Sequence, residues 1–538
     1  MAAQQERKKS VGGLTRRDFL YLTGVGAAGM ALPGIPGFSE GAEKKPKYGG
    51  RLVVGERFAP PGLDPHRNQL FPEYQAYLLM YNALTIMGPL PEVGMHPDLA
   101  KSWEISSDGR EYIFSLRENV KFHHGKELDS GDVKYSFDRV MNPETRAPKR
   151  FAFQWVDAIN IVDKYHIKFR LKEPFGPFLT TLTIMDCPII PAGSQPTGTK
   201  PVPGTGPFVL KSYIPNETYE VARFDKYWEI DEKTGMRLPY LHEVYVKKIV
   251  DETIRWTALR TGDVDYIQVP PFKVALDENK KPTPGVVVVN PPPVGSTWVY
   301  LNCSKPPFDK KEVRQALAHA FNKEAIVKGA MWGFGETTNN QPFLSRSRYY
   351  VPVKDREVDL PKARQLLAAA GYPKGFKTEF FEYPYNKYTD PAQVAIGQLK
   401  EVGIEATMKI LDRAAWTREM IKGNYSISLS GDSERLDPDD AFFMRLHSSE
   451  IGKNNWSRYS NKEMDELLQK GRTTWKWEDR APIYKKVVEL IKEELPIIYL
   501  MKTVNHTAHR DYVKGHDFGA ATWFGYYGGG VKKTWLDK

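Results

Sequence analysis

The chain lacks the features that mark most enzymes, nucleic-acid-binding proteins and permanent membrane proteins. It has no H-E-x-x-H motif, because His242-Glu243 is followed by Val-Tyr-Val, and no P-loop, because Gly125-Lys126 lacks the rest of that motif. Its net charge of +10 is spread thinly after the N-terminal region, without the basic stripe that tracks phosphates. The apolar N-terminal run at residues 21–32 is shorter than the roughly 20 residues that cross a bilayer. These absences speak against nucleotide chemistry, against nucleic acid as a partner and against a permanent transmembrane helix.

Two enzyme-like motifs are present, but both lie in settings that do not support their chemistry. Residues 24–29 match the dinucleotide-binding fingerprint, yet no strand precedes them. Residues 37–41 (G-F-S-E-G) match the nucleophile elbow, yet they lie in a Pro/Gly-rich linker. His506 and His509 stand three apart in an expected strand and loop, where this spacing does not converge on a metal. The sequence therefore predicts no catalytic residue, no metal site and no cofactor.

What the chain does have is enough apolar material for several domains. It is 538 residues long, with 41% hydrophobic and 12% aromatic residues. A single hydrophobic core stops growing at roughly 250–300 residues, so two or three domains are expected. The aromatic content also leaves rings available for contact with a ligand.

The N-terminal segment resembles a twin-arginine export signal. Arg16-Arg17 are followed by Phe19 and by the short run at residues 21–32, which is rich in Gly, Ala and Leu. This pattern predicts export to the periplasm by the twin-arginine translocase. Cleavage after about Ser39 or Ala42, and retention of the signal as a membrane tether, both stay open.

A strand followed by a helix is expected at residues 298–327. Trp298 and Tyr300 fall on one face of the strand and Val299 and Leu301 on the other, before a turn at Pro306-Pro307. Asp309 is the expected N-cap of the helix. The apolar stripe of that helix is Val313, Ala316, Leu317, Ala320 and Phe321. Because a proline-rich run precedes it, this stretch marks the start of a second lobe.

A small antiparallel sheet is expected earlier in the chain. Residues 97–104, 108–117 and 120–125 alternate with period two and are separated by Asp-Gly and His-Gly turns. A helix follows, for which Asp129 or Ser130 is the expected cap.

Several motifs recur in an order that resembles the extracytoplasmic solute-binding proteins of family 5, which serve peptide and nickel importers. The early motifs are D-L-A-K-S-W-E (98–104), D-G-R-E-Y-I-F-S-L-R (108–117), V-K-F-H-H-G-K (120–126) and D-V-K-Y-S-F-D (132–138). The later ones are G-T-G-P-F (204–208) and the segments 258–265, 302–327, 361–376, 399–404, 459–468 and 480–496. The match spans about residues 48–515.

This resemblance implies an α/β fold of the two-lobed, type II-like periplasmic-binding-protein class, with hinge strands and an extra α+β accessory domain. The implied division is 1–46 for the signal and linker, 47–93, 203–294 and 499–538 for lobe I, 94–202 for the accessory domain, and 295–498 for lobe II. Pro291–Pro293 with Gly295, and Pro496, lie where two hinge strands are expected to cross.

The resemblance also implies ligand-binding residues. Asp432, which follows Gly431 near an Asp-Pro pair, matches the aspartate that holds the α-ammonium of a peptide ligand, although its spacing from Asp437 is longer than in the relatives. A buried ammonium needs a carboxylate to offset its lost hydration. The alternative is that residues 437–440 only cap the next helix and that Asp432 is a solvated loop residue.

Tyr383 stands where dipeptide-binding relatives have the arginine that clamps a ligand carboxylate, which favours a longer peptide or a solute without an anionic far end. The family's cleft positions correspond here to Asn68, Phe71, Tyr385, Trp416, Asn455 and Trp456, with ordinary packing as the alternative for each. Cys187 and Cys303 fall in different implied domains, so a disulfide between them would oppose hinge motion.

The sequence therefore favours a non-enzymatic periplasmic receptor that delivers a peptide or similar solute to an ABC permease and its ATPase subunits. A monomer is expected. A secreted hydrolase exported by the twin-arginine route, and a chaperone-like peptide holder, are the alternatives. The ligand itself is left open.

Overall fold

The computed structural model describes residues 45–88, 95–290, 293, 295–343, 345, 347–432, 437–516 and 530–538. The chain divides into two units, residues 1–45 and 46–538, and everything below concerns the second. The predicted export signal, Pro291-Pro292 and residues 433–436 lie outside the described residues. Within the described ranges, no helix is both long and apolar enough to span a membrane.

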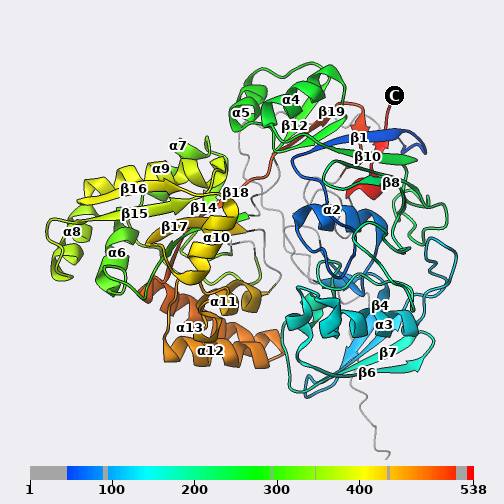
Figure 1. The fold of residues 1–538 in the computed structure, drawn as a ribbon, viewed down its shortest axis with the longest axis horizontal. Coiled ribbons are helices and arrows are strands. Elements are labelled where there is room, and N and C mark those ends of the chain that lie inside the picture. Colours follow the sequence, from blue (N-terminus) through cyan, green and yellow to red (C-terminus); the bar gives the residue numbers. More distant parts are fainter. Residues whose placement is uncertain are drawn as a thin grey trace, which may run out of the picture. The chain divides into compact units, whose positions relative to one another are not determined.

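A seven-stranded sheet gathers strands from three separate stretches of the chain, in the order β12-β19-β11-β1-β10-β9-β8 (Figure 1). Its central strand β1 (Arg51–Glu56) runs parallel to β10 (Glu243–Lys248) and β11 (Tyr266–Gln268), so the carboxyl ends of these strands meet at one edge. The other strands are β8 (Phe208–Ile214), β9 (Thr218–Arg223), β12 (Val286–Val289) and β19 (Thr507–Arg510). The same stretches contain α2 (Phe71–Met80), α4 (Glu252–Thr261), α5 (Phe272–Lys280) and the short elements β2 (Thr85–Met87), β20 (Val513–Lys514), η5 (Gly530–Lys533) and β21 (Trp535–Leu536).

A second sheet has six strands in the order β14-β18-β13-β17-β15-β16. Strand β13 (Gly295–Leu301) lies antiparallel between β17 (Ile427–Asp432) and β18 (Ile497–Thr503). Strand β15 (Phe376–Glu382) is parallel to β17 and to β16 (Ile404–Ile410). The remaining elements are α6 (Lys311–Ala320), α7 (Lys323–Ala330), β14 (Gly335–Thr337), α8 (Leu360–Ala369), α9 (Asn386–Glu401), α10 (Arg413–Lys422), α11 (Pro438–Leu446), η4 (Ser448–Glu450), α12 (Lys462–Thr473) and α13 (Trp477–Glu494).

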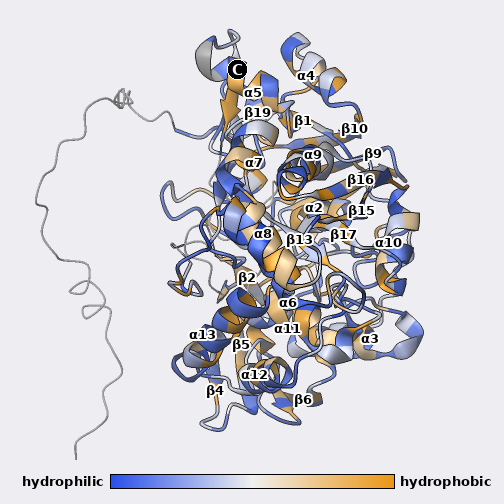
Figure 2. Ribbon diagram, turned by 90° about the vertical axis from the view of Figure 1, so that its left-hand side faces the viewer, coloured by the Kyte–Doolittle hydropathy of each residue, from blue (hydrophilic) through white to orange (hydrophobic). Residues whose placement is uncertain are grey.

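The predicted alternation along β13 is confirmed, and both of its faces are buried. Val299 and Leu301 belong to the core beneath α6, whereas Trp298 and Tyr300 belong to a separate cluster on the other face. Figure 2 shows hydrophobic and hydrophilic residues alternating along α6 and α8, whose apolar sides pack into the first of these cores. The predicted cap at Asp309 is wrong. The helix begins later, and the Asp309 N–H instead bonds the Lys305 carbonyl in the preceding turn at 3.0 Å.

Four strands in the order β4-β5-β7-β6 form a third sheet, which packs against α3 (Ser130–Met141). The strands are β4 (Ala100–Ile105), β5 (Glu111–Leu116), β6 (Val156–Asp163) and β7 (His166–Leu171), with β3 (Met95–Pro97), η1 (Pro143–Thr145), η2 (Arg150–Phe153) and η3 (Phe178–Leu182) nearby in sequence. The strand predicted at 120–125 is wrong, because this segment turns back on itself through a 2.8 Å bond from Phe122 N–H to the Lys126 carbonyl. The cap at Asp129 is confirmed as a full capping box with Asp132.

Two connections join the seven-stranded and six-stranded sheets, one between β12 and β13 and one at Val504–His506 between β18 and β19. Strand β18 pairs within the six-stranded sheet over its whole length. The predicted lobe boundary at 498/499 therefore falls inside a strand, and Pro496 precedes that strand instead of marking a crossing. The other domain boundaries stay predictions. The two connections meet where His506 Nδ1 lies 2.6 Å from Asn290 Oδ1.

Candidate functional site

A cavity of about 750 Å³ lies among α2, loops that flank the four-stranded sheet, and α11. This volume is typical of a small-molecule site. Its apolar lining includes Leu70, Phe71, Tyr74, Leu78, Tyr81, Phe151, Trp155, Phe175, Ile184, Met185, Phe443 and Met444. Its charged lining consists of Asp98, Lys149, Asp186, Asp432, Asp439, Asp440, Glu450, Lys453, Arg472 and Lys532. The wall is thus aromatic and aliphatic with charges of both signs set into it.

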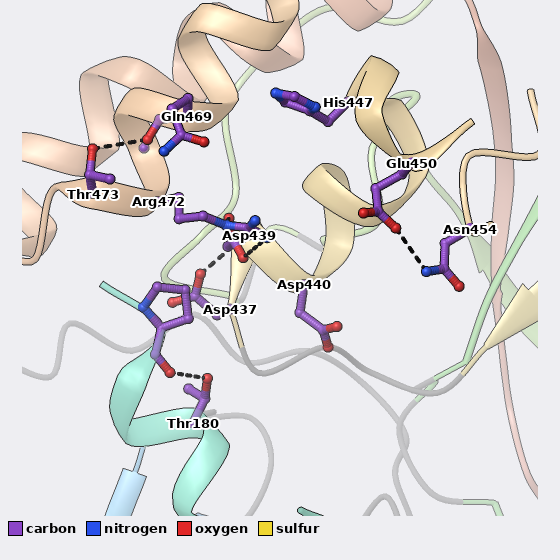
Figure 3. A network of polar contacts seen from close by, with 12 residues as sticks. Thr180, Asp437, Asp439, Asp440, His447, Glu450, Asn454, Gln469, Arg472 and Thr473 are labelled. Carbon is purple, nitrogen blue, oxygen red and sulfur yellow. Dashed lines mark hydrogen bonds and ion pairs between the residues drawn. The ribbon is translucent and has the colours of Figure 1, made fainter. Parts of the chain in front are cut away.

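The start of α11 carries carboxylates that arginines from two other helices hold in place. Asp437 caps the helix by accepting the Asp439 N–H at 2.8 Å, and its two oxygens accept from Arg480 of α13 at 2.7 and 2.5 Å. Arg472 of α12 makes a two-pronged contact with Asp439 at 2.9 Å in each bond. Burial raises the pKa of Asp439 to about 6, and the Arg472 charge acts against this rise. Figure 3 shows Arg472 beside Asp439, with Asp437 and Asp440 nearby and Thr180 of η3 below them.

Another part of the lining carries a third ion pair, in which the side chains of Lys149 and Asp186 are 28% and 13% exposed. Lys149 Nζ lies 3.1 Å from Asp186 Oδ1, and this carboxylate raises the pKa of Lys149. Asp98 accepts from Asn82 Nδ2 and from the Ala83 N–H at 2.9 Å each, while burial raises its pKa to about 7. Burial thus favours the neutral form of Asp98, whereas the Asp186 carboxylate favours the charged form of Lys149.

Asp432, the predicted ammonium clamp, lines the cavity and forms an ion pair with Arg445 of α11. The Arg445 guanidinium also lies 4.8 Å from the ring centre of Trp298 on β13. Asp432 is therefore oriented by a neighbouring cation instead of being a freely solvated loop residue. Its carboxylate belongs to the cavity wall at the end of β17.

The predicted aromatic residues Tyr383, Tyr385, Trp416 and Trp456 come together, but they are outside the lining of this cavity. The Tyr383 ring lies 5.0 Å from Trp416 and 6.3 Å from Tyr385, and Trp416 lies 5.3 Å from Trp456, all between centroids. The structure thus joins these four residues into one row of rings.

Of the three remaining predicted residues, one lines the cavity and two form hydrogen bonds with nearby backbone. Phe71, at the start of α2, lines the cavity. Asn68 accepts from the Asp64 N–H at 3.3 Å. Asn455 is fully buried and donates to the carbonyls of His447 and Tyr459 at 3.1 and 2.9 Å. Both asparagine side chains therefore stabilise local backbone.

One strand in each of the two large sheets ends in a buried glutamate. The residues that follow these two strands contact each other. Glu56 ends β1 and Glu382 ends β15, and burial raises the pKa of both well above the usual range. Arg57, which follows β1, places its guanidinium 4.6 Å from the centre of the Tyr385 ring. The residues after β1 and after β15 thus touch.

Sequence reasoning missed the contribution of the accessory segment, including Lys149, Trp155, Phe175 and Asp186. Trp155 and Phe175 stack with their centroids 5.3 Å apart. The available signal was the set of aromatic residues on either side of strands β6 and β7, namely Phe151, Phe153, Trp155, Phe175 and Phe178.

The cysteines and histidines form no second site in the described part of the chain. There, no group of three or more His, Cys, Asp and Glu residues is arranged to hold a metal ion. Cys187 and Cys303 are free thiols, and burial raises the pKa of both, to about 11 for Cys303. Burial lowers the pKa of His506 to about 4, so this ring is neutral near pH 7.

The cavity, the sheets and the order of the elements now allow comparison with known proteins. The family model described as bacterial extracellular solute-binding proteins, family 5 Middle, matches residues 94–454. The chain belongs to family 5. Family 5 proteins bind solutes and deliver them to ABC transporters, so this family 5 protein is not an enzyme.

Individual relatives agree over most of the chain. This family 5 protein is 29% identical over 467 residues to heme-binding protein A of Haemophilus influenzae, covering 81% of this chain and 84% of that protein. It is 30% identical over 418 residues to glutathione-binding protein GsiB of Pectobacterium atrosepticum, covering 75% and 79%. The ABC-transporter-associated periplasmic binding protein DppA of Helicobacter pylori, in complex with peptide STSA, matches with a TM-score of 0.77 and 27% identity over 91% of this chain and 99% of that one. The predicted two-lobed α/β fold class is confirmed.

Proposed function

We propose that this family 5 protein captures a peptide or a similar small solute in the cavity beside α2 and α11 and delivers it to an ABC permease. The observation that carries this proposal is the cavity of about 750 Å³, whose lining comes from segments far apart in the chain. Such a site forms only when these segments are held together, which suits a receptor that closes on its solute. The relatives bind a peptide, glutathione or heme according to their names.

The most direct test identifies what the protein carries. Native mass spectrometry of protein purified without unfolding is expected to detect a bound solute in the mass range of a short peptide or similar molecule. Protein that carries no solute, and whose melting temperature responds to no peptide in a broad panel, would contradict the proposal. A solute at 100-fold above its Kd is expected to stabilise the fold by about 2.7 kcal/mol.

Within this function, Asp432 is proposed to hold a positively charged group of the solute. Its carboxylate lines the cavity, and Arg445 orients it. Asp432→Asn is expected to weaken peptide binding by tenfold or more, measured by calorimetry. Asp225→Asn is the control, because the Asp225 side chain is 86% exposed. Equal affinities in the two variants would remove Asp432 from the site.

The other sequence-predicted residues divide in the same proposal. Phe71 contacts the solute within the cavity. Tyr383, Tyr385, Trp416 and Trp456 form an aromatic wall next to Arg57, where the segments of the two large sheets meet. Closure about the connections at residues 290–294 and 504–506 is proposed to bring this wall onto the solute, and the closed form to dock on the permease and its ATPase subunits.

Export by the twin-arginine translocase to the periplasm, with a cleaved or tethering signal, is also proposed, together with a monomeric state. Arg16-Arg17 carry the export proposal. Replacing both with lysine is expected to leave the protein in the cytoplasm, measured by cell fractionation. Unchanged export would point to another route. A sedimentation mass near 61.3 kDa or that of the processed chain is expected for the monomer.

A further inference from the structure

Every charged side chain in the described lining of the cavity already has an interaction within the protein. Lys149 pairs with Asp186, and Arg472 pairs with Asp439. Asp432 pairs with Arg445, Lys453 with Glu450, and Lys532 with Glu229. Asp98 accepts a hydrogen bond from the uncharged Asn82 amide, and the Asp440 charge raises the pKa of Lys149. Because each cation of the described lining already has a carboxylate partner, a solute that fills the cavity need not bring an anionic group to these walls. A charge brought without a partner would lose hydration at a cost of several kcal/mol.

The uncharged part of the wall is made of rings and aliphatic side chains. Trp155 stacks on Phe175, and the Arg472 guanidinium covers the Phe443 ring at 3.1 Å from its centre. An arginine that is both ion-paired and stacked has most of its hydrogen-bond donors occupied, and it exposes a flat guanidinium surface to a ligand. The cavity therefore offers contact area more than hydrogen bonds.

Large apolar residues are also exposed where the cavity meets solvent. Leu70 is 63% exposed, Phe71 40% and Phe151 50%, and all three line the cavity. A single exposed apolar residue needs no explanation, but a group at one cavity marks a surface for an apolar ligand. We call these three residues the apolar rim.

We propose that the cavity is a compartment for the uncharged, hydrophobic part of the solute, which enters over the apolar rim. The solute class is one with bulky aromatic or aliphatic groups, such as a peptide with hydrophobic side chains. The one charged group of the solute placed in this compartment is the cation that Asp432 is proposed to hold, and other charged groups stay outside it. The assignment of solute class rests on the proposed function, whereas the apolar character of the compartment is independent of it.

The compartment is tested with N-phenyl-1-naphthylamine, an uncharged aromatic fluorophore that brightens in apolar surroundings. The purified full chain is expected to bind one molecule saturably. The rim variant Leu70→Ser/Phe151→Ser is expected to weaken binding about tenfold, through loss of apolar contact area. The matched control is Ile161→Ser/Val162→Ser on β6, whose residues are 50% and 57% exposed and lie outside the lining. Far-UV circular dichroism and melting temperatures confirm that both variants are folded.

The solute class is tested with three tetrapeptides of equal length and termini, Ser-Phe-Leu-Ser, Ser-Asn-Gln-Ser and Ser-Asp-Lys-Ser. The first is expected to displace the fluorophore at a concentration at least tenfold lower than the other two.

The outcomes separate the two proposals. The compartment is overturned if the fluorophore does not bind saturably, or if the rim variant and its control bind it equally. Either result holds whether or not peptides bind. Peptide binding without preference for the hydrophobic one overturns the solute class and leaves the receptor function in place. Tight fluorophore binding that no peptide displaces supports the compartment and contradicts the peptide part of the proposed function.

Discussion

Single residues around α11 show how much of this fold depends on buried ion pairs. Asp437 and Arg480 are each only 4% exposed at their side chains, and two short hydrogen bonds join them. A buried ion pair of this kind stabilises the fold little more than apolar residues of the same shape would. Removing one partner, however, leaves the other as a buried charge without a counter-charge, which is strongly destabilising. The start of α11, and with it one wall of the cavity, therefore depends on this pair.

The first prediction concerns that pair. Asp437→Ala is expected to lower the free energy of unfolding by about 3–5 kcal/mol, because it strands the Arg480 guanidinium and removes the cap of α11. Urea denaturation measures the change. Asp479→Ala, at an exposed position in the first turn of α13, is expected to cost less than about 1 kcal/mol. Similar losses in the two variants would mean that Arg480 finds other partners.

A second residue-scale prediction concerns pH. Glu382 is fully buried, and its Oε1 accepts the Leu429 N–H at 2.6 Å while burial raises the carboxyl pKa well above the usual range. A raised folded-state pKa contributes stability below the unfolded pKa of about 4.5, and this contribution is lost as pH rises through the folded value.

Glu382→Gln removes this titration. Its free energy of unfolding relative to the unmodified protein is therefore expected to increase from pH 5 to pH 8, measured by denaturation at both values. Glu401→Gln, at an exposed helix position, controls for other titrating groups. A constant difference between Glu382→Gln and the unmodified protein would show that Glu382 titrates normally.

At the scale of elements, the loop after β7 packs directly against the connection between α12 and α13. The Gly176 N–H bonds the Arg472 carbonyl at 2.8 Å. A Cβ on Gly176 would lie 2.5 Å from the Thr474 carbonyl oxygen and 2.8 Å from Arg480 Nε. The segments that carry two walls of the cavity are thus in direct backbone contact, and the contact leaves no room for a side chain.

The third prediction compares two glycines. Gly176→Ala is expected to lower the melting temperature by several degrees, because overpacking at a backbone contact typically costs about 1–3 kcal/mol. Gly397→Ala in α9, where a Cβ would meet nothing within 4 Å, is expected to raise stability by about 0.5–1 kcal/mol through helix propensity. Opposite signs in calorimetry support this account. A stable Gly176→Ala protein would mean that the two segments separate easily.

At the scale of the whole molecule, no disulfide limits how the parts move. Cys187 lies in the core beneath the four-stranded sheet, and Cys303 packs against the cluster on one face of β13. A bond between them would tie the accessory segment to the six-stranded sheet. The structure has both as free thiols.

The fourth prediction follows from these free thiols. Protein purified without reductant and unfolded in guanidinium is expected to titrate two thiols per chain with a thiol reagent. The native protein is expected to react more slowly, because Cys187 is buried, Cys303 is partly buried and the pKa of both thiols is raised. A count of zero thiols after unfolding would reveal a disulfide. Addition of reductant is expected to leave the melting temperature unchanged.

Local patterns predicted much of the framework. The alternation along Trp298–Leu301 identified a strand with two distinct faces, and Asp129 identified the start of α3. That both faces are buried became known only from the structure. The prediction of a strand at 120–125 was wrong, because these alternating residues belong to a turn in which the Phe122 N–H bonds the Lys126 carbonyl. The predicted cap at Asp309 was wrong for a similar reason, because the Asp309 N–H bonds the Lys305 carbonyl in the preceding turn.

The candidate site was only partly accessible from the sequence. Asp432 and Phe71 do line the cavity, whereas Asn68 and Asn455 bond to nearby backbone, which a motif match cannot distinguish from a ligand contact. Lys149 and Asp186 went unnoticed, because their importance arises from a pairing that is visible only once the loops pack together.

By itself, the sequence determined the family, the absence of catalytic motifs and the position of many strands and helices, because periodicity, turn residues and ordered motifs are local properties of the chain. Only the tertiary structure decided which side chains share the cavity and that each cation of its described lining already has a carboxylate partner. The physical reason is that α2, the loops around Lys149 and Phe175, and the start of α11 are distant in sequence, and their contacts depend on how the cores beneath them pack.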